Sequence, residues 1–175
     1  MSGITGIFRR DGRPVESAEI ARMGEVMAHR GPDGSGTWSE GPAALGHLML
    51  HSTRESLHEE LPLPRPGGEL VITADARIDN RDELIAALDL NGTARDGMAD
   101  SELILLAYER WGEGCAERLV GDFAFAIWDG RRQMMFCARD HFGMKPFYYH
   151  LSPTLFALGS EIKALLALPG VPRRV

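Results

Sequence analysis

The chain has 175 residues, of which 44% are hydrophobic and 25% are charged. These proportions are ordinary for a globular protein, and the length is enough for one domain with a buried core. The net charge of −6, with arginines scattered along the chain, argues against a nucleic-acid-binding surface. No apolar run approaches bilayer length and the N-terminus has no leader pattern, so we expect a cytoplasmic protein without membrane association.

Cysteine and histidine positions predict neither a disulfide nor a metal site. Cys115 and Cys137 stand alone, without a second cysteine at metal or redox spacing, and we expect both to be buried reduced thiols. The spacing of the histidines also does not match a metal-binding motif, as seen at His47, His51, His58 and His150.

The first half of the chain contains three predicted strands and one predicted helix. Residues 2–8 are predicted to form a strand, and Asp11-Gly12 a turn. From Ser17, apolar residues recur at helical spacing, and Gly31-Pro32 ends the predicted helix. Residues 43–50 and 69–74 are predicted strands, separated by a loop rich in proline and glutamate.

The second half contains the clearest local signal. Asn80 starts a predicted helix, with Glu83 at capping-box spacing, and residues 101–111 form a second one. Residues 123–128 and 133–137 are predicted strands of a hairpin that turns at Asp129-Gly130. A strand at 155–158 and a helix at 161–168 follow. Strands in hairpins, with helices apart from them, indicate an α+β fold rather than a parallel doubly wound sheet.

Several short motifs occur in a characteristic order. They are Ser2-Gly3-Ile4, His29-Arg30-Gly31-Pro32-Asp33, Ala99-Asp100-Ser101-Glu102, Arg139 to Tyr149, and Gly159 to Leu165. In this order and at these separations they resemble the glutamine-hydrolysing N-terminal domain of asparagine synthetase, a class II glutamine amidotransferase. The resemblance covers essentially the whole chain. It implies an N-terminal-nucleophile hydrolase fold, with two stacked antiparallel sheets sandwiched between helical layers, and a single domain over residues 1–175.

Position 2 departs from the pattern of this family. The family opens Met-Cys-Gly-Ile, and its Cys is the nucleophile while the free α-amine of the same residue is the base. Here the residue is Ser2, whose hydroxyl is far less acidic than a thiol and depends wholly on an activating base. While Met1 is retained, the Ser2 nitrogen is a peptide amide and cannot be that base. Ser2 is therefore either a doubtful nucleophile or simply a small residue at the start of a strand.

Three further site positions of the family also differ. Met49 aligns with the Arg that clamps the α-carboxylate of glutamine, a bidentate contact that Met cannot replace. Asp75 and Ala76 align with the Asn-Gly pair of the oxyanion hole. A carboxylate at Asp75 has the wrong sign for stabilising a developing negative charge, whereas Ala76 still offers a backbone N–H. We therefore interpret the site as degenerate.

Asp100 matches the family residue that binds the α-ammonium of glutamine. It also stands just before Ser101, where the N-cap of a helix is expected. Capping explains the residue without a ligand, and we predict that Asp100 is a helix cap.

The charged cluster Arg139-Asp140-His141 allows two interpretations. As an isolated motif it could serve acid–base chemistry. Within the family it is a structural corner close to the domain boundary, and we favour that interpretation.

Two longer segments, residues 45–63 and 75–81, resemble one particular group within this family. They look more like the asparagine-synthetase-like proteins of bacterial peptide-maturation clusters, including lasso peptide cyclases. Those enzymes adenylate a carboxylate with ATP, and the attacking amine comes from the substrate itself. Glutamine hydrolysis is then not needed, which would rationalise losing the nucleophile, the clamp and the oxyanion Asn together.

The resemblance also implies partners and cofactors. The Ser-Gly-Gly-x-Asp-Ser motif that binds ATP pyrophosphate in the family's C-terminal synthetase domain is absent from this chain. We therefore expect no cofactor in this domain, ATP and Mg²⁺ only in the missing synthetase domain, and as partners that domain and a precursor peptide. Two alternatives stay open, namely a slow Ser-dependent glutaminase that supplies ammonia for asparagine synthesis and a non-catalytic docking module for the synthetase domain or a peptide.

Overall fold

The computed structural model describes residues 1–53, 55–90 and 97–173. The chain divides into two compact units. The first unit comprises Met1–Leu50 and Pro146–Val175, and the second comprises His51–Lys145.

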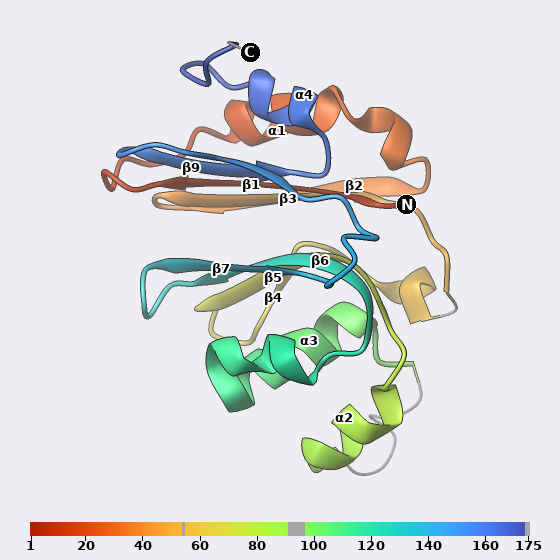
Figure 1. The fold of residues 1–175 in the computed structure, drawn as a ribbon. Helices are drawn as coiled ribbons and strands as arrows, with labels where there is room; N and C mark the ends of the chain where they lie inside the picture. Colours follow the sequence, from red (N-terminus) through yellow and green to blue (C-terminus); the bar gives the residue numbers. More distant parts are fainter. Residues whose placement is uncertain (54, 91–96, 174–175) are drawn as a thin grey trace. The chain divides into compact units, whose positions relative to one another are not determined.

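The first unit is built on a five-stranded antiparallel sheet with the order β2-β3-β1-β9-β8. Its strands are β1 (Gly3–Arg9), β2 (Gly34–Glu40), β3 (Ala43–Met49), β8 (Tyr148–Leu151) and β9 (Leu155–Gly159). Two helices, α1 (Ser17–Glu25) and α4 (Ile162–Leu166), cover one face of this sheet (Figure 1). A 3₁₀ helix, η1 (Ala28–Arg30), follows α1.

Period-two alternation decides which side chains of this sheet meet the helices. Ile7 of β1 and Leu48 of β3 pack into one apolar cluster with Ile20 and Met23 of α1 and Leu165 of α4. Thr5 stands opposite Gly46 in the β1–β3 ladder, and a Cβ atom on Gly46 would lie 2.4 Å from Thr5 Oγ1. Any larger residue at position 46 would therefore force the Thr5 side chain to shift.

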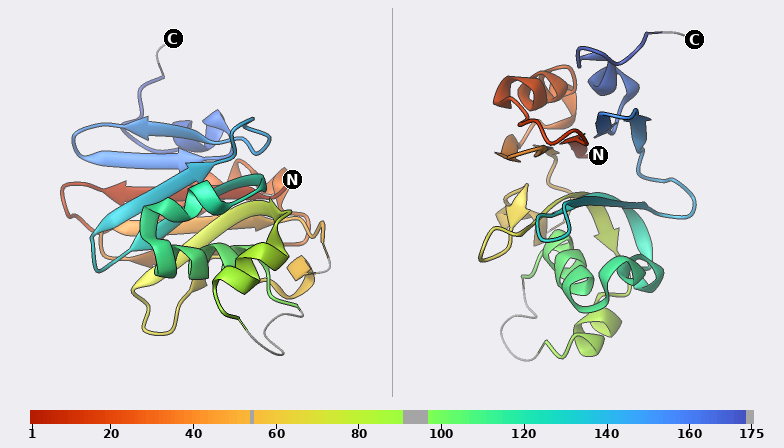
Figure 2. Two further views of the ribbon diagram at one scale, coloured as in Figure 1. Left: turned by 60° about the horizontal axis from the view of Figure 1, so that its bottom comes forward. Right: turned by 90° about the vertical axis from the view of Figure 1, so that its left-hand side faces the viewer.

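The second unit carries a four-stranded antiparallel sheet with the order β4-β5-β6-β7. Its strands are β4 (Leu63–Pro64), β5 (Leu70–Ile78), β6 (Gly121–Asp129) and β7 (Met134–Arg139). Helix α3 (Asp100–Trp111) packs against β5 and runs across one face of the sheet (Figure 2). The unit also contains helix α2 (Arg81–Ala87) and the 3₁₀ helices η2 (Glu55–His58) and η3 (Gly112–Arg118).

An aromatic cluster joins helix to sheet in the second unit. Tyr108 of α3 stacks on Phe136 of β7, with ring centroids 5.4 Å apart, and Phe136 meets the edge of Phe125 of β6 at 5.9 Å. Phe125 is fully buried. These rings hold α3 against the sheet by the burial of apolar surface.

The predicted α+β architecture agrees with the structure, because every strand pairing in the described residues is antiparallel. The strands β2, β4 and β8 were not predicted. The helix expected from Ser17 is shorter than its apolar pattern, since it ends at Glu25 and gives way to η1. None of the helices in the described ranges has both the length and the apolar character needed to cross a membrane.

The capping box predicted at Asn80 is wrong, although the helix does begin there. Asn80 occupies the N-cap position of α2 without a capping hydrogen bond from its side chain. Its amide instead donates to the Arg118 carbonyl over 2.9 Å and accepts from the Val120 N–H over 3.0 Å. The side chain therefore ties the start of α2 to the segment before β6.

Candidate functional site

The candidate residues fall into two groups, one in each unit. Ser2 and Met49 belong to the first unit, and Asp75, Ala76 and Asp100 belong to the second.

Ser2 lies directly before β1 and is buried. Its hydroxyl is engaged by the backbone at the end of β3, because Ser2 Oγ accepts from the Leu50 N–H at 3.1 Å and lies 3.3 Å from the Leu50 carbonyl oxygen, to which it can donate. These contacts join β1 to β3 beyond their last paired residues. The hydroxyl therefore has a structural role that does not require a substrate.

Met49 lies close to Ser2 in the same sheet. The antiparallel register pairs Gly3 with Leu48, and extending it by one residue places Ser2 opposite Met49. Met49 is buried among apolar strand residues. On the same face of β3, burial lowers the pKa of His47 to about 3, so its imidazole is neutral at physiological pH. Met49 itself offers no cation to a carboxylate, and the neutral imidazole of His47 does not supply one.

A charged group anchors the main chain at position 2. Arg30 donates through one terminal nitrogen to the Ser2 carbonyl at 3.2 Å and through Nε to Glu161 at 2.5 Å. Glu161 also contacts His29 at 2.9 Å and Lys163 at 3.0 Å. Burial opposes ionisation of Glu161, but hydrogen bonds from Arg30, Lys163 and His29 outweigh it and lower the pKa of this carboxyl to about 2. The anchor therefore stays charged at any physiological pH.

Asp75 is buried on β5 and pairs with Lys145. The Lys145 ammonium lies 2.7 Å from Asp75 Oδ1, and both side chains are largely removed from solvent. The other carboxylate oxygen, Oδ2, has no hydrogen-bond partner among the described residues. The next residue, Ala76, stands opposite Phe123 in the β5–β6 ladder. The carboxylate expected at the oxyanion position is thus present and is neutralised from within the second unit.

Asp140 fixes the loop that carries Lys145. Its carboxylate accepts from the backbone N–H groups of Met144 at 3.0 Å and Lys145 at 3.2 Å. Burial would raise the pKa of Asp140, but these amides outweigh it and lower the pKa. These contacts agree with the interpretation of Arg139-Asp140-His141 as a structural corner.

The prediction that Asp100 caps α3 is wrong. The N-cap is Ala99, and Asp100 is the first helical residue without a capping hydrogen bond. Its Oδ2 atom accepts from the Ile78 N–H at 3.1 Å, and its Oδ1 atom pairs with Arg81. The end of β5 and the start of α2 recruit the carboxylate more strongly than the N-terminus of α3 does, because Arg81 brings a full charge.

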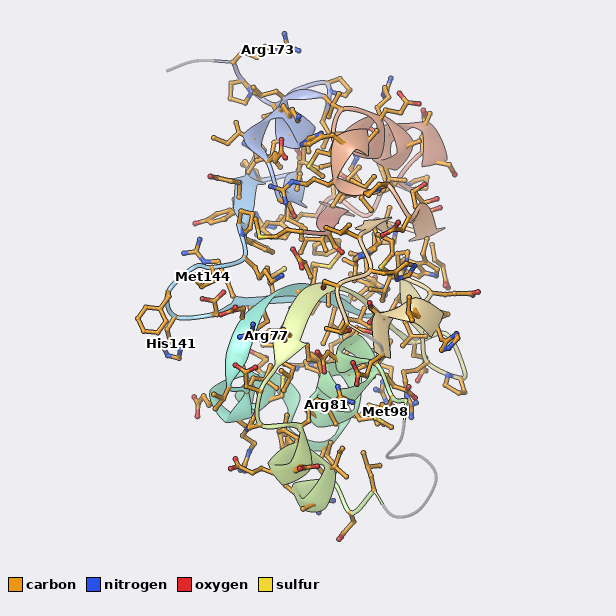
Figure 3. The ribbon with its side chains drawn as sticks, turned by 90° about the vertical axis from the view of Figure 1, so that its right-hand side faces the viewer. Arg77, Arg81, Met98, His141, Met144 and Arg173 are labelled. Carbon is orange, nitrogen blue, oxygen red and sulfur yellow. The ribbon has the colours of Figure 1, made fainter. Side chains whose placement is uncertain are left out.

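Arg81 completes this contact. Its second terminal nitrogen donates to the Met98 carbonyl at 2.6 Å, and Figure 3 shows Arg81 and Met98 close together. Burial raises the pKa of Asp100, an effect that the Ile78 amide and the Arg81 guanidinium reduce. Asp100 therefore holds β5, α2 and α3 together, with both carboxylate oxygens occupied.

A second carboxyl, which is partly buried, lies near this contact. Ser101 Oγ donates to Glu59, and burial raises the pKa of Glu59. Sequence reasoning did not identify Glu59, because it lies in a polar loop 42 residues before Ser101.

A cavity of about 280 Å³ opens in the first unit, between α1 and the strands β2 and β3. Its lining includes Thr5, Ile20, Gly24, Thr37 and Gly46, and none of the five candidate residues. This cavity is therefore separate from the candidate site.

Sequence reasoning proposed the five candidate positions but did not predict the residues that contact their functional groups. Lys145, Arg81 and Glu161 were not assigned, and Arg30 was expected to form a local ion pair at the Gly31-Pro32 turn rather than to reach Glu161. Lys145, Arg30 and Glu161 nevertheless lie inside the motifs that carry the family resemblance, which was the available signal. Arg81 lies at the end of the segment 75–81, which carries the finer resemblance within the family.

Comparison with known proteins places this geometry in a family. The sequence matches the family described as "Glutamine amidotransferase domain" over residues 1–175. The chain belongs to this family. A likeness to the glutamine phosphoribosylpyrophosphate amidotransferase of B. subtilis confirms the N-terminal-nucleophile amidotransferase fold, with a TM-score of 0.73, 20% identity, and coverage of 94% of this chain and 43% of that one.

Curated relatives of this amidotransferase domain include asparagine synthetases. The chain is 35% identical to asparagine synthetase [glutamine-hydrolyzing] 3 of Bacillus subtilis, over 100% of the chain and 29% of the relative. It is 38% identical to a putative asparagine synthetase of Mycobacterium bovis, over 90% of the chain and 26% of the relative. The chain thus spans between a quarter and a third of the length of these two relatives.

Proposed function

We propose that this amidotransferase domain is the N-terminal part of an ATP-dependent, amide-forming enzyme of the asparagine synthetase family, and that its own glutamine hydrolysis is lost. The length of the relatives supports a following synthetase domain. In this proposal ATP and Mg²⁺ bind to that following domain, and the protein works in the cytoplasm.

The observation that carries the proposal is that both carboxylate oxygens of Asp100 already have partners within the protein. It is the one pocket residue that this chain shares with the active family, yet both of its carboxylate oxygens have partners in the second unit, Ile78 and Arg81. A glutamine α-ammonium would have to displace a guanidinium to reach it. Met49 offers nothing to the α-carboxylate, so neither end of the amino acid is recognised.

The catalytic positions support the same proposal. The Ser2 hydroxyl is engaged by the backbone of Leu50, and the oxyanion position holds the Asp75 carboxylate rather than a neutral donor. Loss of the nucleophile, the clamp and the oxyanion donor together is what we expect where the amine comes from the substrate itself. The finer proposal is therefore a relative of the lasso peptide cyclases, with a precursor peptide as partner.

Calorimetry with L-glutamine tests the loss of the pocket. We expect no saturable heat from the wild-type protein, because both recognition groups are missing or occupied. Saturable binding that disappears in Asp100→Asn would overturn the proposal, since it would show that the carboxylate still serves an ammonium. In the same gene, a pyrophosphate-binding loop downstream of residue 175 is expected, and its absence would overturn the assignment to an ATP-dependent enzyme.

A further inference from the structure

The strand β8 forms an edge of the first unit's sheet and carries large apolar side chains. Among the described strands it pairs only with β9. Three of its four side chains, those of Tyr148, Tyr149 and Leu151, are apolar in body and exposed, Tyr149 by 64%. Natural sheets protect such edges with charges, proline or a covering segment. An apolar edge of this kind marks a surface that another segment covers.

The apolar character extends to both faces of the edge. Tyr149 and Leu151 stand opposite Leu158 and Phe156 of β9, and the rings of Tyr149 and Phe156 are 6.1 Å apart. Tyr148 stands opposite Gly159 on the other face, where α4 packs against β8 and β9. Ile162, the first residue of α4, is also exposed. We call Tyr148, Tyr149, Leu151 and Ile162 the β8 surface.

The last described residues of the chain lie beside α4, the helix that packs on β8. After α4, the chain stays beside the helix as far as Arg173, whose guanidinium donates to the Leu166 carbonyl at 3.2 Å (Figure 3). Arg173, the last residue that the structure describes, therefore lies beside the helix that packs on β8. The two asparagine synthetase relatives are matched over only 29% and 26% of their lengths.

We infer that the β8 surface docks the domain that follows residue 175 in the longer protein. This inference rests on the proposed function, which supplies that domain. The partner must present an apolar patch to the two tyrosines and Leu151, together with backbone groups able to pair with the open edge of β8. Tyrosine suits such a contact because its ring buries a large apolar area while its hydroxyl stays satisfied.

Nitration of tyrosine by tetranitromethane measures directly how accessible the tyrosines of the β8 surface are. The chain contains three tyrosines, of which Tyr148 and Tyr149 belong to the β8 surface and Tyr108 is 3% exposed in the second unit. In the full-length protein encoded by the parent gene, we expect both surface tyrosines to resist nitration as Tyr108 does. Peptide mass spectrometry measures the three residues in one sample.

A matched pair of variants makes the test specific. Leu151 is 58% exposed and Leu57, in the second unit, is 57% exposed. In the full-length protein, Leu151→Asp is expected to raise the nitration of Tyr148 and Tyr149 several-fold, and Leu57→Asp to leave it unchanged. Increased nitration of Tyr108 would show that a variant has unfolded. If Leu151→Asp unfolds the protein, Ile162→Asp replaces it in the test.

Three outcomes would overturn the inference. Tyr148 and Tyr149 could react in the wild-type full-length protein at the rate of a tyrosine peptide, or the two leucine variants could behave alike. Either result would leave the proposed function standing. A parent gene with no synthetase domain after residue 175 would instead overturn the docking surface and the proposed function together.

Discussion

Asp100 carries a carboxylate whose two oxygens both have partners inside the second unit, Ile78 and Arg81. We expect Asp100→Asn to lower the free energy of unfolding by roughly 1–3 kcal/mol, because Arg81 loses its charged partner at a largely buried position. A simple helix cap would tolerate the same change, since Asn caps about as well as Asp. Urea unfolding of the variant and the wild type measures the difference.

The Arg77–Asp79 pair provides the matched control for this prediction. Both side chains are half exposed, at 56% and 50%. Asp79→Asn should therefore cost less than about 1 kcal/mol, as is usual for exposed pairs. Equal costs for Asp100→Asn and Asp79→Asn would contradict the role that we assign to Asp100.

The lowered pKa of Glu161 predicts that the stability of the protein depends on pH. Its pKa falls from an ordinary value of 4.5 to about 2 in the folded protein. A depressed carboxyl pKa contributes stability above the unfolded value, and this contribution is lost as the pH falls towards the folded value. The stability advantage of the wild type over Glu161→Gln should therefore be full above pH 4.5 and shrink between pH 4.5 and about 2.

Urea unfolding at a series of pH values measures this difference. Glu40→Gln, at an exposed carboxyl at the end of β2, is the control, and its difference from the wild type should stay small throughout. A stability gap for Glu161→Gln that is unchanged down to pH 3 would contradict the prediction.

At the scale of residues, sequence reasoning identified positions but not pairings. Departures at Ser2, Met49 and Asp75 could be proposed from the sequence, because each residue stands where the family resemblance implies another type. The partners Lys145 and Glu161 are not visible in the same way, because they lie 70 and 131 residues from Asp75 and Arg30. Only the fold brings such groups within hydrogen-bonding distance.

At the scale of elements, the Asp75–Lys145 pair ties the strand β5 to the loop after β7. Replacing Lys145 with Met leaves the Asp75 carboxylate buried without a cation, which should cost about 3–5 kcal/mol of unfolding free energy. The double variant Asp75→Asn/Lys145→Met removes both charges and should lose much less. Denaturant unfolding of the two single variants and the double variant gives the coupling energy.

The outcome that contradicts this prediction is additivity. If the double variant loses the sum of the two single losses, Asp75 and Lys145 do not act as a pair. Their contact would then contribute nothing to the attachment of the loop to β5.

Long, apolar elements were predicted well, and short or polar ones were not. β3 and β6 contain runs of buried residues whose pattern is strong in the sequence. β2, with the sequence GSGTWSE, and β8, with only four residues, lie at the two edges of their sheet and bury little, so their patterns are weak. The extent of α1 was overestimated because Val26 and Met27 continue its apolar spacing after the helix has ended at Glu25.

At the scale of the whole molecule, the family and the fold come from the order of motifs along the chain, and the state of the site comes from local replacements. A fold does not imply an activity, because activity depends on particular side chains. This chain keeps the motifs that build the amidotransferase fold, including the Asp140 corner and the Glu161 anchor. In the function that we propose, the groups that would bind and attack glutamine are replaced or occupied.

Ammonia release from L-glutamine tests this central claim most directly. The wild-type protein and the Ser2→Cys variant are compared with heat-killed controls, and mass spectrometry establishes whether Met1 is present in each. We expect both proteins to release no more ammonia than their controls, because a thiol at position 2 restores neither the carboxylate clamp at Met49 nor the oxyanion donor at Asp75. Release well above the control from either protein would contradict the account.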